Sequence, residues 1–129
     1  MYIFLMPNVK IMLQILLFVC LLTAGNVLWK YGLIQINGFM TNGKMWAKSL
    51  WDLATCSFMW IGAFFYIVGT LYWFTILSRN NLSYVYPMVS IGYILTSIMG
   101  VVLFGETISL TGWVGMGIVL IGFVVLSYR

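Results

Sequence analysis

The chain alternates between long uncharged stretches and short segments that carry charge. Four stretches contain no charged side chain, and they comprise residues 11–29, 53–78, 80–105 and 107–128. An α-helix rises about 1.5 Å per residue, so about 20 residues cross a hydrocarbon core of about 30 Å. Within lipid, a single segment satisfies its own backbone hydrogen bonds only as a helix, and the pattern therefore predicts helices that span a membrane.

The first stretch continues past the charge that interrupts it. Apolar residues resume after Lys30 and reach Ile34, and no A-x-A cleavage signature is present, which argues against a secretory signal. We therefore expect a single all-α integral membrane domain that occupies residues 1–129. Its four transmembrane helices are predicted at about 11–34, 53–77, 82–104 and 110–128.

The segment 35–52 is the sizeable loop between these predicted helices. Its second half combines two lysines with Trp46 and Trp51. Tryptophan prefers the headgroup region of a bilayer, and lysine reaches from that depth into water. The segment is therefore predicted to lie at the membrane surface, with a short surface helix near residues 44–52.

Composition supports the membrane assignment and limits the functions to consider. Hydrophobic residues make up 64% of the 129 residues and charged residues only 6%, against roughly 25% charged residues in soluble domains. The net charge of +4 comes from scattered lysines and arginines, so nucleic acid is not an expected partner. Histidine is absent, the two acids lie far apart, and no phosphate-binding GxxxxGKS/T motif occurs. We expect no enzyme, and no catalytic, metal or cofactor site.

Small residues predict where helices pack closely. Gly92, Thr96 and Gly100 recur every fourth residue of the third predicted helix, so they form a ridge that another helix backbone can approach. Gly115 and Gly122 share one face of the fourth predicted helix, because seven residues make about two turns. This second face fits either packing within the chain or contact with a second subunit.

Lys30 is the most informative cation, because it lies inside the first apolar helix. An ionised side chain at membrane depth is costly and often marks a functional site, although a lysine near a helix end also snorkels to the interface. Glu106 ends the third predicted helix, and counting chain crossings places it on the same side of the membrane as Lys30. The two side chains are predicted either to form a structural ion pair or to line a headgroup site together.

A second polar region lies at the opposite membrane face. Arg79 and two asparagines form a turn, and Tyr84, Tyr86 and Pro87 follow in the opening turns of the third predicted helix. Proline leaves a backbone carbonyl without its usual partner, and such positions in membrane helices often border cavities. The tyrosines also fit the simpler role of aromatic residues at the membrane interface.

Three segments carry a resemblance to a known family. They read AGNVLWKYG at 24–32, LSYVYPMVSIGYI at 82–94 and LFGETISLTGWVGMGIVLIGFVVL at 103–126. Together they resemble the drug/metabolite transporter superfamily in its short four-helix, small multidrug resistance-like form. The likeness is strongest to the aminoarabinose-phosphoundecaprenol flippase subunits. The A-G-Q…K element of those subunits reads Ala24, Gly25, Asn26 and Lys30 here, and their A-Y-P-M element reads Val85, Tyr86, Pro87 and Met88.

The resemblance implies a carrier that moves a polyprenyl-phosphate-linked sugar across the bacterial inner membrane for modification of the cell envelope. It implies a homodimer, or a heterodimer with a related small subunit, surrounded by membrane lipids. By the same match, Lys30 would face the lipid phosphate, Glu106 would be the family's glutamate at the end of the third helix, and Tyr86 with Pro87 would line the pathway. On physical grounds, Arg79 could bind the phosphate near the opposite membrane face. The substrate-binding residues expected on this basis are Lys30, Glu106, Tyr86, Pro87, Tyr84, Arg79 and Asn26.

Two other functions remain to be considered. Small multidrug exporters of cations share the four-helix plan, but they use a glutamate two turns before the lysine, where this chain has Leu22. A cation without a nearby acid in the same helix suits a phosphate better than a positively charged drug. The alternative from another class is a non-transporting subunit of a membrane glycosyltransferase or of a sister transporter. Asn26 in place of glutamine and the long 35–52 loop leave the identity of the sugar open.

Overall fold

The computed structural model describes residues 9–38 and 46–127. Within these two ranges the chain forms six helices, which are α1 Val9–Gln35, α2 Trp46–Thr55, α3 Ser57–Leu77, α4 Leu82–Met88, α5 Ile91–Phe104 and α6 Leu110–Ser127. The expected all-α class is confirmed for the described part of the chain.

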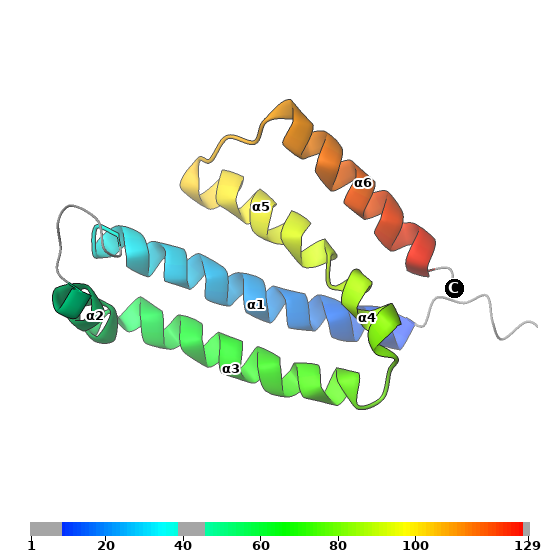
Figure 1. Cartoon of the computed structure of the whole chain (residues 1–129), viewed down its shortest axis with the longest axis horizontal. Coiled ribbons are helices and arrows are strands. Elements are labelled where there is room, and N and C mark those ends of the chain that lie inside the picture. The colour runs from blue at the N-terminus through cyan, green and yellow to red at the C-terminus, as the bar shows by residue number, and fades with distance from the viewer. Residues whose placement is uncertain (1–8, 39–45, 128–129) are drawn as a thin grey trace, which may run out of the picture.

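The long helix α1 lies at the centre of the bundle. Helix α3 runs along one side of it, α5 lies on its other side, and α6 packs beyond α5 and α4 (Figure 1). Helix α2 is seen end-on in the same view, so it runs across the end of the bundle rather than along it. This course fits a helix that lies on the membrane surface.

Glycines bring α1 and α3 into close contact. A Cβ atom on Gly25 would lie 2.7 Å from the Tyr66 ring, and one on Gly62 would collide with the indole of Trp29. The rings of Trp29 and Tyr66 stack at 4.2 Å between centroids, and the Trp29 Nε1 donates to the Met59 carbonyl at 3.1 Å. In lipid such close packing, rather than the hydrophobic effect, holds neighbouring helices together.

The predicted small-residue ridge of α5 faces α1. A Cβ on Gly92 would lie 3.2 Å from the Val19 side chain, and the hydroxyls of Thr23 and Thr96 are hydrogen-bonded at 3.2 Å. On α6, by contrast, a Cβ on Gly115 or Gly122 would meet no atom within 4 Å among the residues that the structure describes. Gly115 and Gly122 therefore do not serve packing within the described part of this subunit, whereas Gly92 and Thr96 of the α5 ridge do.

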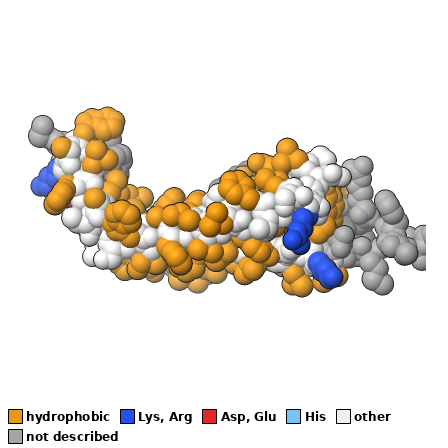
Figure 2. Space-filling view, turned by 90° about the horizontal axis from the view of Figure 1, so that it is seen from below, with side chains coloured by type: hydrophobic (Ala, Val, Ile, Leu, Met, Phe, Trp, Pro, Cys, Tyr) orange, Lys and Arg blue, Asp and Glu red, His pale blue; other side chains and the backbone are white. Residues whose placement is uncertain are grey.

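Three segments are long and apolar enough to cross a membrane, namely Val9–Gln35, Ser57–Leu77 and Leu82–Phe104, and Leu110–Leu126 is a shorter apolar helix. Hydrophobic side chains cover the length of the molecule, while basic side chains lie near its two ends (Figure 2). Because these exposed apolar surfaces require lipid around them, the chain is a multi-pass membrane protein.

The structure corrects two predicted helices. The second predicted helix, 53–77, begins only at Ser57, because its first residues belong to α2 and Cys56 adopts an extended backbone conformation between the two. A short helix is thus present where the surface helix was expected, but it is displaced toward the C-terminus, and Lys44 lies outside the described residues. The third predicted helix, 82–104, is interrupted at Val89 and Ser90.

Pro87 provides the physical reason for that interruption. Its nitrogen has no hydrogen, and its ring crowds the preceding turn. The amides that follow form short-range bonds, from Ser90 to the Pro87 carbonyl at 3.1 Å and from Gly92 to the Val89 carbonyl at 2.8 Å. The chain therefore passes from α4 to α5 through a tight turn, and both helices lie within one span.

Candidate functional site

The backbone at the end of α5 directs the side chain of Glu106 back toward α1. Gly105 adopts a left-handed conformation with φ of 65°, which ends the helix, and the Glu106 amide donates to the Gly100 carbonyl at 3.3 Å. The Glu106 side chain folds back over Gly100, since a Cβ there would lie 2.5 Å from a carboxylate oxygen. Only a residue without a side chain leaves this space to the carboxylate.

Lys30 and Glu106 form an ion pair, so the expected meeting of these two side chains is confirmed. The Lys30 Nζ also lies 4.8 Å from the centroid of the Phe104 ring, close enough for a cation–π contact. Yet the two charged side chains remain 42% and 45% exposed. The ammonium is thus neutralised within the chain and still accessible to a ligand at the helix end.

Asn26 lies one turn before Lys30 on α1. Its side-chain oxygen accepts a hydrogen bond of 2.6 Å from the Tyr66 hydroxyl of α3, and both residues are half-buried. The asparagine therefore ties α1 to α3 in the present arrangement, close to the ion pair along the helix.

Tyr86 lies at the opposite end of the bundle, where it separates two hollows. Its exposed ring meets Trp73 edge-on at 5.4 Å. A hollow of about 250 Å³ is lined by Phe18, Trp73, Tyr86, Val89, Ser90 and Tyr93. A second one of about 580 Å³ is lined by Asn81, Leu82, Ser83, Tyr86 and Pro87.

Pro87 lines the larger of these hollows. Pro87 has no N–H to donate to the carbonyl of Ser83, four residues earlier, and both residues line the larger hollow. A carbonyl released from its helix in this way is an acceptor for a polar ligand.

The remaining two predicted residues have different surroundings. Tyr84 packs against the apolar core cluster and lines neither of the two hollows. Arg79 is exposed in the turn after α3 and forms no ion pair with any residue the structure describes. The predicted residues therefore divide into two groups at opposite ends of the bundle, with Lys30, Glu106 and Asn26 at one end and Arg79, Tyr84, Tyr86 and Pro87 at the other.

Two features of the ion-pair site are absent from the sequence prediction. Gly100 appears there as a packing residue, whereas in the structure it makes room for the Glu106 carboxylate. Phe104 provides the aromatic ring beside Lys30. The only signal in the sequence for this contact is that Phe104 directly precedes Gly105. Among the described residues, no three His, Cys, Asp or Glu side chains gather as metal ligands.

Comparisons with known proteins give one consistent relationship. A protein of Aeromonas hydrophila is 32% identical over 114 residues, which cover 88% of this chain and 94% of that protein. A protein of Pseudomonas syringae is 28% identical over 104 residues, or 80% and 88% of the two chains. A Proteus mirabilis protein is 34% identical over 61 residues, which span 47% of this chain and about half, 54%, of that relative.

Each of these relatives is named as a probable 4-amino-4-deoxy-L-arabinose-phosphoundecaprenol flippase subunit ArnE. No family model and no solved structure matches the chain. Because the Aeromonas protein is aligned over nearly its whole length, the chain belongs to the ArnE family of flippase subunits.

Proposed function

We propose that this chain is a subunit of a flippase that carries an undecaprenyl-phosphate-linked sugar across the bacterial inner membrane. The observation that carries the proposal is the accessible Lys30–Glu106 ion pair near the C-terminal end of the mostly apolar helix α1. The names of the relatives support the same class of substrate.

A cation in a membrane helix lowers the main energetic cost of flipping a lipid, which is the transfer of its charged phosphate into hydrocarbon. An unpaired phosphate costs many kcal/mol to move into hydrocarbon, so a carrier has to offer it a charge partner. Lys30 supplies that partner, and Glu106 neutralises the ammonium while no lipid is bound. Displacement of the carboxylate by the lipid phosphate then exchanges one partner of Lys30 for another, so the ammonium is paired at both stages while the released Glu106 carboxylate, which is 45% exposed, turns to water.

The opposite end of the bundle offers groups that fit release or reception of the headgroup. Tyr86 borders two hollows, and Arg79 provides a second cation nearby. The Ser83 carbonyl receives no hydrogen bond from position 87, because proline has no N–H. Hydroxyl and carbonyl groups suit the hydroxyls of a sugar, and the guanidinium suits a phosphate.

The architecture we propose has four crossings, with α6 as the fourth. Its 18 residues measure about 27 Å, near the thickness of a hydrocarbon core. Most of its large apolar side chains are exposed, and the open glycines at 115 and 122 lie on the same helix. A second, related four-helix subunit that packs on this helix would complete the carrier as a dimer, consistent with relatives named as subunits.

The decisive experiment reconstitutes the purified assembly into liposomes and follows transfer of a labelled polyprenyl-phosphate sugar between leaflets. Lys30→Ala and Glu106→Gln are expected to lower the transfer rate at least tenfold while membrane insertion is unchanged. Lys10→Ala is the matched control, because Lys10 is exposed at the other end of α1. Wild-type rates in both site variants would refute the assignment. A stable assembly that transfers no lipid would favour the accessory role instead.

A further inference from the structure

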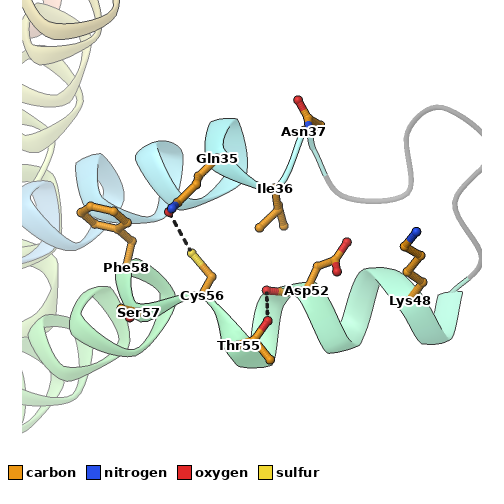
Figure 3. A pocket seen from close by; sticks show the side chains of 9 residues that line it. All are labelled: Gln35, Ile36, Asn37, Lys48, Asp52, Thr55, Cys56, Ser57 and Phe58. Atoms are coloured by element: carbon orange, nitrogen blue, oxygen red, sulfur yellow. Dashed lines mark hydrogen bonds between the residues drawn. The ribbon is translucent and has the colours of Figure 1, made fainter.

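A polar pocket of about 550 Å³ lies where the end of α1 meets α2 and the start of α3 (Figure 3). Its lining comes from three segments and comprises Gln35, Ile36, Asn37, Lys48, Asp52, Thr55, Cys56, Ser57 and Phe58. Figure 3 shows Lys48 and Asp52 on the same side of α2, with the Asp52 carboxylate directed toward the end of α1. A hollow of this size with several converging polar groups is typical of a binding site for a small ligand.

The polarity of this pocket is unusual for this chain. Only 6% of the residues are charged, yet the lining contains Lys48 and one of the two acids of the whole sequence. The side-chain amides of Gln35 and Asn37 and the hydroxyls of Thr55 and Ser57 add donors and acceptors. This set of groups matches a ligand that carries both charges and hydroxyls.

Helix α2 places the pocket at the depth of the lipid headgroups. Trp46 and Trp51 are 68% and 70% exposed, and tryptophan at a membrane interface lies at headgroup level. Ser49 on the same helix is fully buried, so α2 has one face against the protein and another toward the bilayer surface. A lipid headgroup therefore reaches the pocket without leaving the membrane surface.

The pocket is separate from the Lys30–Glu106 site. Gln35 follows Lys30 by five residues, which places it about 140° further around α1. Lys30 accordingly faces the end of α5, whereas Gln35 faces α3, where the Cys56 thiol lies 3.8 Å from its side-chain oxygen. Helix α2 and the end of α5 lie near the same end of the bundle but on different sides of α1 (Figure 1).

We propose that this pocket is a loading site for the headgroup of the carried lipid, a sugar phosphate that bears an ammonium group. Lys48 and Asp52 are four residues apart on one face of α2, so their opposite charges line the pocket about one turn from each other. Asp52 pairs with the ammonium and Lys48 with the phosphate, while the amides and hydroxyls bind the sugar. The inference rests on the proposed function and adds that the amine of the sugar is recognised here, before the phosphate reaches Lys30.

Binding measurements test this with three probes. The full chain, with any subunit that co-purifies with it, is placed in nanodiscs of phosphatidylglycerol. It is titrated with a polyprenyl-phosphate amino sugar, with the same lipid N-acetylated, and with phosphatidylethanolamine. The wild type is expected to bind the amino sugar at least tenfold more tightly than the other two. Asp52→Asn is expected to remove this preference by weakening only the amino-sugar probe, because N-acetylation and Asp52→Asn abolish the same ion pair.

Further variants separate the pocket from the ion-pair site. Lys48→Ala is expected to weaken the binding of both polyprenyl probes, and the matched Lys10→Ala is expected to weaken the binding of neither. If Asp52→Asn cannot be purified, this pair of variants still tests whether the pocket binds the lipid. Lys30→Ala should weaken both polyprenyl probes while their ratio stays unchanged. A tenfold preference that survives in Asp52→Asn would overturn the loading site, as would equally tight binding of phosphatidylethanolamine, which would make this a site for bulk lipid. Absence of binding of either polyprenyl probe to the wild type would instead refute the proposed function itself.

Discussion

The two ends of the bundle differ in the kind of side chains that make the contacts between segments. At the end that contains Arg79, the side chains of Ile15, Ile76, Val85 and Met88 are almost completely buried in one apolar cluster. At the other end, the contacts between segments involve an accessible ion pair and a pocket lined by polar groups. The buried apolar cluster thus lies at one end, and most of the charged side chains that a ligand can reach lie at the other.

This difference indicates how a small membrane protein keeps a polar site accessible to a ligand while its helices stay packed. Lipid gives helices little hydrophobic reason to associate, so close packing has to hold them together. The apolar cluster and the glycine contacts between α1 and α3 provide that packing through side chains other than those of Lys30 and Glu106. In the mechanism that we propose, Lys30 and Glu106 therefore exchange partners without loosening the whole bundle.

The largest expected effect comes from the packed end. Ile76→Ala removes a fully buried side chain and is expected to lower the free energy of unfolding by about 2 to 5 kcal/mol. Ile67→Ala on the same helix is the control, since Ile67 is exposed and its truncation should cost less than about 0.5 kcal/mol. Reversible unfolding in detergent micelles measures both. Equal losses in the two variants would show that the cluster does not carry the stability of the bundle.

At the polar end we expect a smaller effect, in which lipid transfer falls while the free energy of unfolding changes little. Gly100→Ala places a methyl group where the Glu106 carboxylate lies, so the carboxylate has to move away from Lys30. An exposed ion pair contributes about 0 to 1 kcal/mol, and stability should therefore change little. Lipid transfer should fall about fivefold, equivalent to about 1 kcal/mol.

Gly117→Ala is the matched control for this test, because its new methyl group meets nothing within 4 Å among the described residues and Gly117 lies about 200° around α6 from Gly115, away from the face proposed for the second subunit. Transfer rates and unfolding free energies are compared for the two variants in the same preparation. If Gly100→Ala destabilised the protein by several kcal/mol and left transfer per folded molecule unchanged, Gly100 would be a packing residue and not a positioning residue for Glu106.

Much of this arrangement follows from patterns that are local in the sequence. Charge-free stretches give the spans, and the parity of crossings brings Lys30 and Glu106 to the same end. Small residues at every fourth position of α5 predict its contact with α1, which Gly92 and Thr96 make. These predictions succeed because the period of a helix and the thickness of a bilayer leave few alternatives.

Other features depend on contacts between distant segments and could not be predicted in this way. The polar pocket forms only because α2 turns across the end of α1, which brings Asp52 near Gln35 (Figure 3). The break after Pro87 was not expected either, because a proline near the start of a helix is often tolerated. Tyr84 illustrates the same limit: its sequence neighbourhood matches that of Tyr86, yet it packs against the core cluster.

The smallest expected effect lies between the two ends, where the hydroxyls of Thr23 and Thr96 join α1 to α5 at 3.2 Å. Thr23→Val and Thr96→Val each remove one partner, while the double variant replaces both hydroxyls by methyl groups of similar shape. A double-mutant cycle on the free energy of unfolding is expected to give a coupling of about 0.6 kcal/mol, typical of hydrogen bonds between membrane helices. Because Gly92 already sets the contact of α5 with Val19, the double variant should unfold nearly as the wild type does and transfer lipid at the same rate. A coupling of several kcal/mol would mean that a polar contact, and not the packing at the apolar end, holds α5 in place, and the separation of stability from the ligand-accessible charges would then fail.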